Sequence, residues 1–292
     1  MAIEMKSGNT AALKLAAITA LLLGSQSDAA TMTQGTLRAW DRQVQQTKAA
    51  LLQASIDPAN FLSIDRQSSE LETVEDQQGG VSIHSPRGSG TPVPCGLVHH
   101  WIGAVFIPNA NVAELLTAVE DYNNYSTFYK PAVAESKLLS NSGDQFTYQL
   151  KFVEKGFGVK AGLNGRFRST YRALTPEMGY SITESTELTE LADPQTPDEH
   201  PLSFSESHGY VERIFSIMRY RQVSDGIYVQ VEALTLSRGV PAAVRWMVGP
   251  LIEHFSHRTM AETLERVKAS VQTSTVQEAA RTESTGAVPA RQ

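Results

Sequence analysis

The sequence predicts an α+β fold in which a curved antiparallel sheet wraps around a long C-terminal helix. Residues 97–273 contain, in order, a strand, an amphipathic helix, further strands and a closing helix. The strands alternate apolar and polar residues between turn-rich segments, as antiparallel strands do. The closing segment places four apolar residues on one helical face. These four are Met260, Leu264, Val267 and Val271.

Composition is that of a globular protein. The chain has 292 residues, of which 41% are hydrophobic and 19% are charged. We expect one domain, residues 97–273, with an N-terminal extension over residues 30–96 and a disordered tail over residues 274–292. A net charge of −6 disfavours nucleic acid as a partner, because phosphate binding needs clustered positive charge. The single cysteine, Cys95, cannot form an internal disulfide.

The first 29 residues have the features of a cleavable export signal. Lys6 and Lys14 flank the start of the apolar run Leu15–Leu23, and Ser27–Ala29 offers small residues for cleavage. The apolar run is shorter than the ~20 residues that cross a bilayer. We therefore expect a periplasmic or secreted protein, with an uncleaved membrane anchor as the alternative.

The N-terminal extension is expected to contain a helix, a short hairpin and a linker. Apolar residues from Leu37 to Ala54 form one helical stripe, which needs a partner surface. Segments 61–64 and 81–83 predict the hairpin, and the Pro- and Gly-rich segment 85–94 predicts the linker. The helix could cover the sheet, bind a partner or plug a pocket.

The central segments have strand and turn signals. Residues 99–107 predict the first strand, and Asn109 or Asn111 is expected to cap the helix that follows. Later segments alternate with a period of two, among them one in which Tyr180, Ile182 and Leu188 would share a face.

A hairpin is predicted near the end of the sheet. Asp225-Gly226 favours a two-residue turn. This turn would place Arg219 opposite Glu232 as an exposed ion pair, which would contribute ~0–1 kcal/mol.

The order of these elements resembles the START-like superfamily, also called SRPBCC or helix-grip proteins. Segments Ile102–Pro108, Asp121–Tyr125 and Leu236–Pro241 are similar to those of a group of exported bacterial proteins within it. The resemblance covers residues 97–273. It implies a helix-grip fold with a binding pocket between the sheet and the final helix, and it specifies no ligand.

The export signal and the aromatic-rich helix-grip pattern together favour a protein that binds or carries a hydrophobic ligand, lipid-like or isoprenoid. Burying ten methylenes contributes ~8 kcal/mol, against ~4 kcal/mol or more for association. Transient contact with a membrane is compatible with this role, and no cofactor or metal is expected. Core packing would explain the same side chains equally well. The expected lining residues are Tyr125, Phe128, Tyr148, Phe152, Phe167, Tyr171 and Met218, with Trp246 near the mouth.

Two alternatives remain open. An enzyme of the polyketide-cyclase-like type would need a positioned base, for which Glu184 and Glu212 are the weak candidates. His254 and His257 lack a third ligand at a metal-binding spacing, and no Gly-x-Ser-x-Gly motif is present. The other alternative is a non-catalytic interaction module with a collapsed cavity.

Overall fold

The structure is a computed structural model that describes residues 32–66, 80–88, 90–156, 159–239 and 257–273. The expected export signal, Trp246, His254 and the expected C-terminal tail lie outside these residues.

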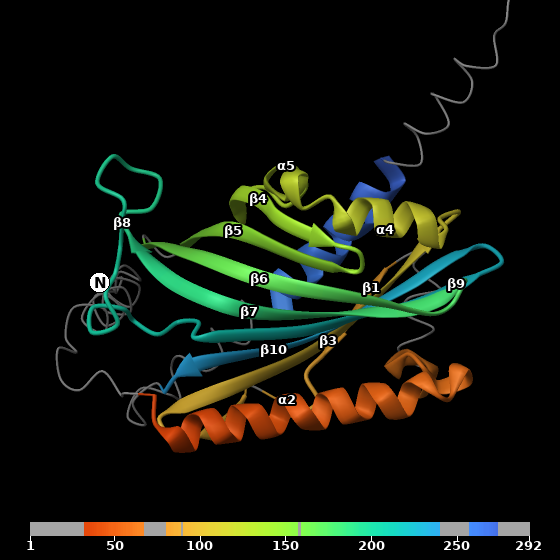
Figure 1. Cartoon of the computed structure of the whole chain (residues 1–292), viewed down its shortest axis with the longest axis horizontal. Coiled ribbons are helices and arrows are strands. Elements are labelled where there is room, and N and C mark those ends of the chain that lie inside the picture. The colour runs from red at the N-terminus through yellow and green to blue at the C-terminus, as the bar shows by residue number, and fades with distance from the viewer. Residues whose placement is uncertain (1–31, 67–79, 89, 157–158, 240–256, 274–292) are drawn as a thin grey trace, which may run out of the picture.

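Within the described residues the strands form one antiparallel sheet in the order β1-β3-β10-β9-β7-β6-β5-β4, with β2 on β3 and β8 on β7. The sheet twists strongly along its length (Figure 1). The strands are β1 Val81–His84, β2 Thr91–Val93, β3 Gly96–Pro108, β4 Val133–Ser142, β5 Gln145–Gly156, β6 Val159–Thr175, β7 Met178–Ala192, β8 His200–Pro201, β9 Arg213–Val223 and β10 Gly226–Arg238.

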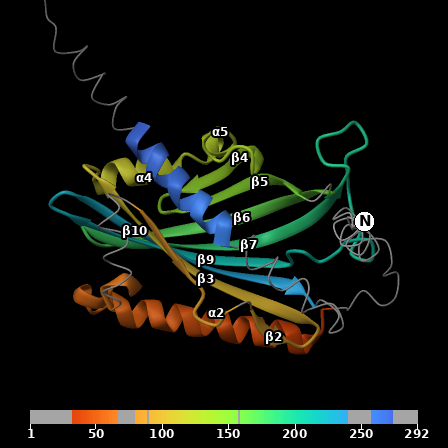
Figure 2. The same cartoon turned by 180° about the vertical axis from the view of Figure 1, so that it is seen from behind.

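Helices cover both faces of the sheet. Helix α2 runs along one face, the outer face, and the C-terminal helix crosses the other, the inner face (Figures 1 and 2). None of the described helices combines the length and hydropathy needed to cross a membrane. The helices are α2 Gln34–Ser55, α4 Val112–Glu120, α5 Tyr125–Phe128 and the C-terminal helix over residues 257–273, with 3₁₀ turns at Pro58–Asn60, Ser63–Arg66 and Tyr122–Asn124.

The C-terminal helix lies directly on strand β3, which confirms the predicted helix-grip fold. Its four apolar residues, Met260, Leu264, Val267 and Val271, are all buried in the inner core. A Cβ added at Gly103 would lie 2.6 Å from Leu264 Cδ1 and 2.9 Å from Met260 Cγ. The missing side chain of Gly103 therefore lets the helix approach the strand.

Helix α2 confirms the predicted N-terminal helix and identifies its partner surface. Its residues Trp40, Val44 and Leu51 are buried in an outer core with Phe215 and Ile217 of strand β9. Thr33 caps the helix through a reciprocal hydrogen-bond pair with Thr36. The helix thus covers the outer face of the sheet and does not plug the inner face.

The predicted hairpin between segments 61–64 and 81–83 is wrong. Segment 61–64 leads into a 3₁₀ turn, and β1 pairs with β3. Asp65 stabilises the turn, because its carboxylate accepts from Leu62 N at 2.8 Å and pairs with Arg221. Phe61, Leu62 and Ile64 are buried in the outer core, so burial determines the conformation here.

The predicted register of the β9–β10 hairpin is also wrong. Val223 pairs with Gly226, so the two loop residues are Ser224 and Asp225, and Arg219 lies opposite Gln230. Gly226 belongs to the strand, where an added Cβ would lie only 2.4 Å from Ile107 O of β3 and clash with it.

Arg219 nevertheless binds Glu232 across a diagonal. The Nη2–Oε2 distance is 2.9 Å, and the two side chains are 4% and 9% exposed. The expected exposed ion pair is therefore buried, because the segment around Phe61 covers this part of the outer face, and Phe61 O accepts from Arg219.

A bulge in β7 overturns the predicted common face of Tyr180, Ile182 and Leu188. Phe167 pairs with Ser185, whereas Arg166 pairs with Glu187, so β7 has one extra residue at this point. Tyr180 consequently belongs to the outer core and Leu188 packs against the inner core.

Candidate functional site on the inner face of the sheet

One part of the inner face of the central strands is only half-buried, although the C-terminal helix crosses that face and Tyr220, Ile227 and Val229 are buried elsewhere on it. On β9, Ser216 and Met218 are half-exposed while Phe215 and Ile217, which face outward, are buried. On β10 the same alternation continues through residues 231–236. A solid interior would bury the inward side chains of central strands most completely. This part of the inner face, around residues 214–218 of β9 and 231–235 of β10, is therefore partly accessible.

We call this surface the inner floor. It consists of half-exposed, inward-facing side chains on β5, β6, β7, β9 and β10. They are Phe152, Leu163, Thr183, Ser185, Leu188, Ile214, Ser216, Met218, Val231, Ala233 and Thr235.

Aromatic side chains close one end of the floor, and we call them the aromatic wall. After α4 the chain turns so that Tyr122 stacks on Tyr148 of β5, with ring centroids 3.9 Å apart. Tyr148 in turn stacks on Phe167 of β6 at 5.6 Å. Such offset aromatic contacts add stability beyond area burial. The wall comprises Tyr122, Tyr125, Tyr129, Phe146, Tyr148, Phe167 and Tyr171.

The structure brings most of the sequence-predicted lining residues together. Tyr148, Phe167 and Tyr171 are buried in the inner core, and Tyr125, Phe152 and Met218 are half-buried against it. Of these six, only Phe152 and Met218 belong to the inner floor.

Phe128 stands apart from this group. Its side chain is half-buried on α5, and its carbonyl accepts from Arg266 of the C-terminal helix at 3.4 Å. Trp246, the predicted residue at the mouth, lies outside the described residues, so its place near the mouth stays a prediction.

Hydroxyl groups cross the floor from strand to strand. Ser216 lies opposite Thr183, and Thr183 lies opposite Ser169. Ser169 Oγ is 2.6 Å from Thr183 Oγ1 and 3.1 Å from the Tyr148 hydroxyl. We call Ser216, Thr183 and Ser169 the hydroxyl row.

The tyrosines of the wall are neutral hydrogen-bonding groups. Burial raises the pKa of Tyr148 to about 12. Burial also raises the pKa values of Tyr122, Tyr125 and Tyr171 well above the ordinary range. These phenols therefore remain protonated near neutral pH and do not supply an anionic base.

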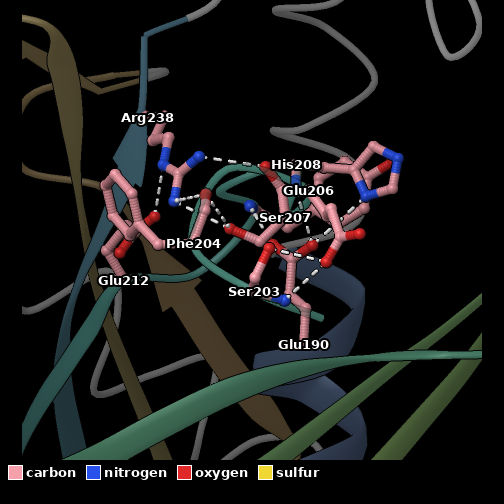
Figure 3. Close-up of polar contacts among 9 residues, drawn as sticks. Glu190, Ser203, Phe204, Glu206, Ser207, His208, Glu212 and Arg238 are labelled. Atoms are coloured by element: carbon pink, nitrogen blue, oxygen red, sulfur yellow. Dashed lines mark hydrogen bonds and ion pairs between the residues drawn. The ribbon is translucent and has the colours of Figure 1, made fainter. Parts of the chain in front are cut away.

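The two predicted candidates for a catalytic base lie away from the inner floor. Glu184 points to the outer face and pairs with Lys48 of α2, with 2.5 Å between Nζ and Oε1. Glu212 pairs with Arg238 at the end of the sheet, also at 2.5 Å (Figure 3). Both carboxylates are engaged in ion pairs, and neither is placed to act on a guest on the inner floor.

The cluster around Arg238 has a structural role. Arg238 donates to Ser207 O and Ser207 Oγ and lies over the Phe204 ring at 4.0 Å (Figure 3). Glu190 accepts from the backbone N–H groups of His208 and Tyr210. These contacts fasten the loop over residues 203–210 to the end of the sheet.

Sequence reasoning missed the hydroxyl row and Glu120. Glu120 ends α4, and burial raises the pKa of its carboxyl. Its charge acts on Tyr122 and Tyr171 of the wall. The signal for the row was available in β7, where Ser181, Thr183 and Ser185 alternate with larger side chains. It was missed because large side chains were taken to mark the ligand face.

The described residues contain no group of three or more His, Cys, Asp or Glu side chains that could hold a metal ion. His257 instead makes an edge contact with Trp101, with ring centroids 6.1 Å apart.

A small pocket of about 190 Å³ lies beneath α2, and its lining includes Ser185 and Ile214, which also belong to the inner floor. Lys48, Glu184 and Arg213 give it a charged lining, beside Trp40 and Phe215. Its size and charge do not suit a large apolar guest, since sites for drug-sized ligands usually measure ~300–1,000 Å³ and are mostly apolar.

No protein-family model and no curated protein match the sequence. Among solved structures, the chain is similar to a fragment of a STAR-related lipid transfer protein from Xanthomonas axonopodis, with 16% identity, a TM-score of 0.42, and coverage of 66% of this chain and 99% of that one. It is similar to the Zhui aromatase/cyclase from Streptomyces sp. R1128, with 10% identity, a TM-score of 0.42, and coverage of 60% and 94%. It is also similar to human STARD10, with 10% identity, a TM-score of 0.42, and coverage of 64% and 69%. At these identities and TM-scores the similarities identify neither a ligand nor a role.

Proposed function

We propose that this protein binds and carries a hydrophobic molecule, lipid-like or isoprenoid, on the inner floor. The observation that carries the proposal is that inward-facing side chains in parts of β9 and β10 are more exposed than the outward-facing side chains beside them. Met218, Val231 and Ala233 face inward yet are half-exposed, while their outward-facing neighbours are buried. Accessible apolar side chains in a concave setting mark ligand sites more often than they mark a packed core.

Apolar contact alone is sufficient for useful affinity. A guest that buries ten methylenes gains ~8 kcal/mol, at ~0.8 kcal/mol for each. Association costs ~4 kcal/mol or more. The balance leaves a favourable binding free energy without a charged anchor or a metal.

The placement of ionisable groups supports a carrier over an enzyme. Glu184 and Glu212 are engaged by Lys48 and Arg238 away from the floor. The half-exposed floor likewise supports a carrier over an interaction module with a collapsed cavity.

Export is part of the proposal. The basic residues, apolar run and small residues of segment 1–29 support a cleavable signal. A periplasmic or secreted carrier would take up its guest during transient contact with a membrane.

Native mass spectrometry and Nile red titration of the purified protein test the proposal. We expect a co-purified hydrophobe and saturable Nile red binding. Ala233→Trp would fill the middle of the floor and weaken Nile red binding by about tenfold or more, which corresponds to ~1.4 kcal/mol.

Thr170→Trp is the matched control, because Thr170 is exposed on the opposite face of β6. It should bind Nile red as the wild type does. Circular dichroism would verify that both variants are folded. A wild-type protein that carries no hydrophobe and binds no Nile red would refute the proposal.

A further inference from the structure

We propose that the inner floor selects an uncharged amphiphile, whose hydroxyl or carbonyl group bonds to the hydroxyl row, over a lipid that carries a carboxylate. This inference rests on the proposed function and names the class of guest.

The hydroxyl row has hydrogen-bonding capacity left for a guest. Tyr148, Ser169 and Thr183 form a chain of hydroxyl contacts that runs from the buried wall to the half-exposed floor. Ser216 extends the row across β9, and its hydroxyl has no partner among the described residues. A hydroxyl both donates and accepts, so the row suits an alcohol or a carbonyl equally.

The row has apolar neighbours on both sides. Met218 and Val231 lie opposite each other on one side of it. Ile214 and Phe167 lie on the other side. Adjacent strands are ~4.8 Å apart, so the row spans roughly 10 Å of a floor whose other members are apolar except for Ser185 and Thr235. An amphiphile with one polar group can thus lie with its chain on apolar side chains and its polar group on the row.

No member of the inner floor is ionisable. At its rim, Arg258 of the C-terminal helix is already paired with Glu262 at 2.7 Å. Two opposite charges lie near the wall and away from the row: Glu120 acts on Tyr122 and Tyr171. Arg266, which donates to Phe128 O, acts on Tyr129. A carboxylate placed on the row would lose its hydration without gaining a cation, which is strongly unfavourable. An uncharged polar group does not bear this cost.

Displacement of Nile red at pH 8 by three probes of equal chain length tests the inference. The probes are 1-dodecanol, methyl dodecanoate and dodecanoate. We expect the alcohol and the ester to displace the dye at concentrations about tenfold lower than dodecanoate, because only dodecanoate carries a charge onto the floor.

Substitutions at Thr183 test whether the hydroxyl row causes the preference for an uncharged probe. Thr183→Val removes one hydroxyl with little change in shape and should weaken 1-dodecanol binding about tenfold, within the range for loss of one hydrogen bond. Thr183→Ser keeps the hydroxyl and should bind 1-dodecanol as the wild type does. Thr170→Val removes an exposed hydroxyl on the opposite face and should change nothing.

Two results separate the two proposals. Displacement by dodecanoate as strong as by 1-dodecanol, with Thr183→Val binding like the wild type, overturns the selectivity and leaves the carrier function standing. Absence of Nile red binding, together with no binding of any of the three probes, overturns both.

Discussion

Tyr148 joins the two parts of the candidate site. Its ring stacks between Tyr122 and Phe167 in the aromatic wall, and its hydroxyl contacts Ser169 of the hydroxyl row. Burial raises its pKa to about 12. Because the raised pKa belongs to the folded state, the folded protein holds this proton at pH values where the unfolded chain has lost it.

Tyr148→Phe tests this linkage. The contribution from Tyr148 is fully present below pH 10 and is lost as pH rises toward 12, since the unfolded tyrosine ionises near pH 10. Without the phenol, the free energy of unfolding should fall less steeply over this window, by up to ~1.4 kcal/mol per pH unit. Urea unfolding at pH 9, 10, 11 and 12 measures the slope. Equal slopes for the two proteins would contradict the assignment.

The two long helices cover opposite faces of the sheet and differ in how much of each face they leave exposed to solvent. The C-terminal helix lies directly on β3 at Gly103, while the neighbouring inner floor stays half-exposed. Helix α2 buries one apolar stripe against the outer face, with Trp40 5% and Leu51 1% exposed. We infer that α2 stabilises the sheet and that the C-terminal helix borders the site.

Trp40→Ala measures what the α2 layer contributes. Loss of this buried ring should lower the free energy of unfolding by ~3–5 kcal/mol, as is usual for buried Trp or Phe. Lys48→Ala on the same helix removes a part-exposed ion pair, with side chains 31% and 38% exposed, and a cation–π contact 5.4 Å from the Phe215 ring centroid. It should cost about 1 kcal/mol. Chemical denaturation compares them. Similar losses in the two variants would mean that α2 is not held by its apolar face.

The order of helices and strands in the whole molecule was predictable from the sequence, whereas the side of the sheet to which each strand side chain points was less so. Alternation and capping identified α2, β3, α4 and the C-terminal helix, because each has a strong local signal. Alternation does not tell which side of a strand faces inward when both sides are covered. Thr183 was therefore overlooked. Tyr180 and Leu188 were assigned to one face because alternation does not reveal the bulge in β7.

The remaining errors have the same physical origin in contacts distant along the chain. The 3₁₀ turn at Ser63–Arg66 depends on Arg221, and the hairpin register depends on the close approach of Gly226 to Ile107. Neither contact leaves a signal in the local sequence. Packing between distant segments also buried the ion pair of Arg219 and Glu232.

Photo-crosslinking tests most directly whether a guest occupies the inner floor. The wild-type protein would be loaded with a long-chain alcohol that carries a diazirine in its chain, irradiated and digested with trypsin. We expect the label in the peptides Ile214–Arg219 and Gln222–Arg238, which contain Met218, Val231 and Ala233. Label confined to α2 or to the loop over residues 203–210, or no label at all, would contradict a guest on the inner floor.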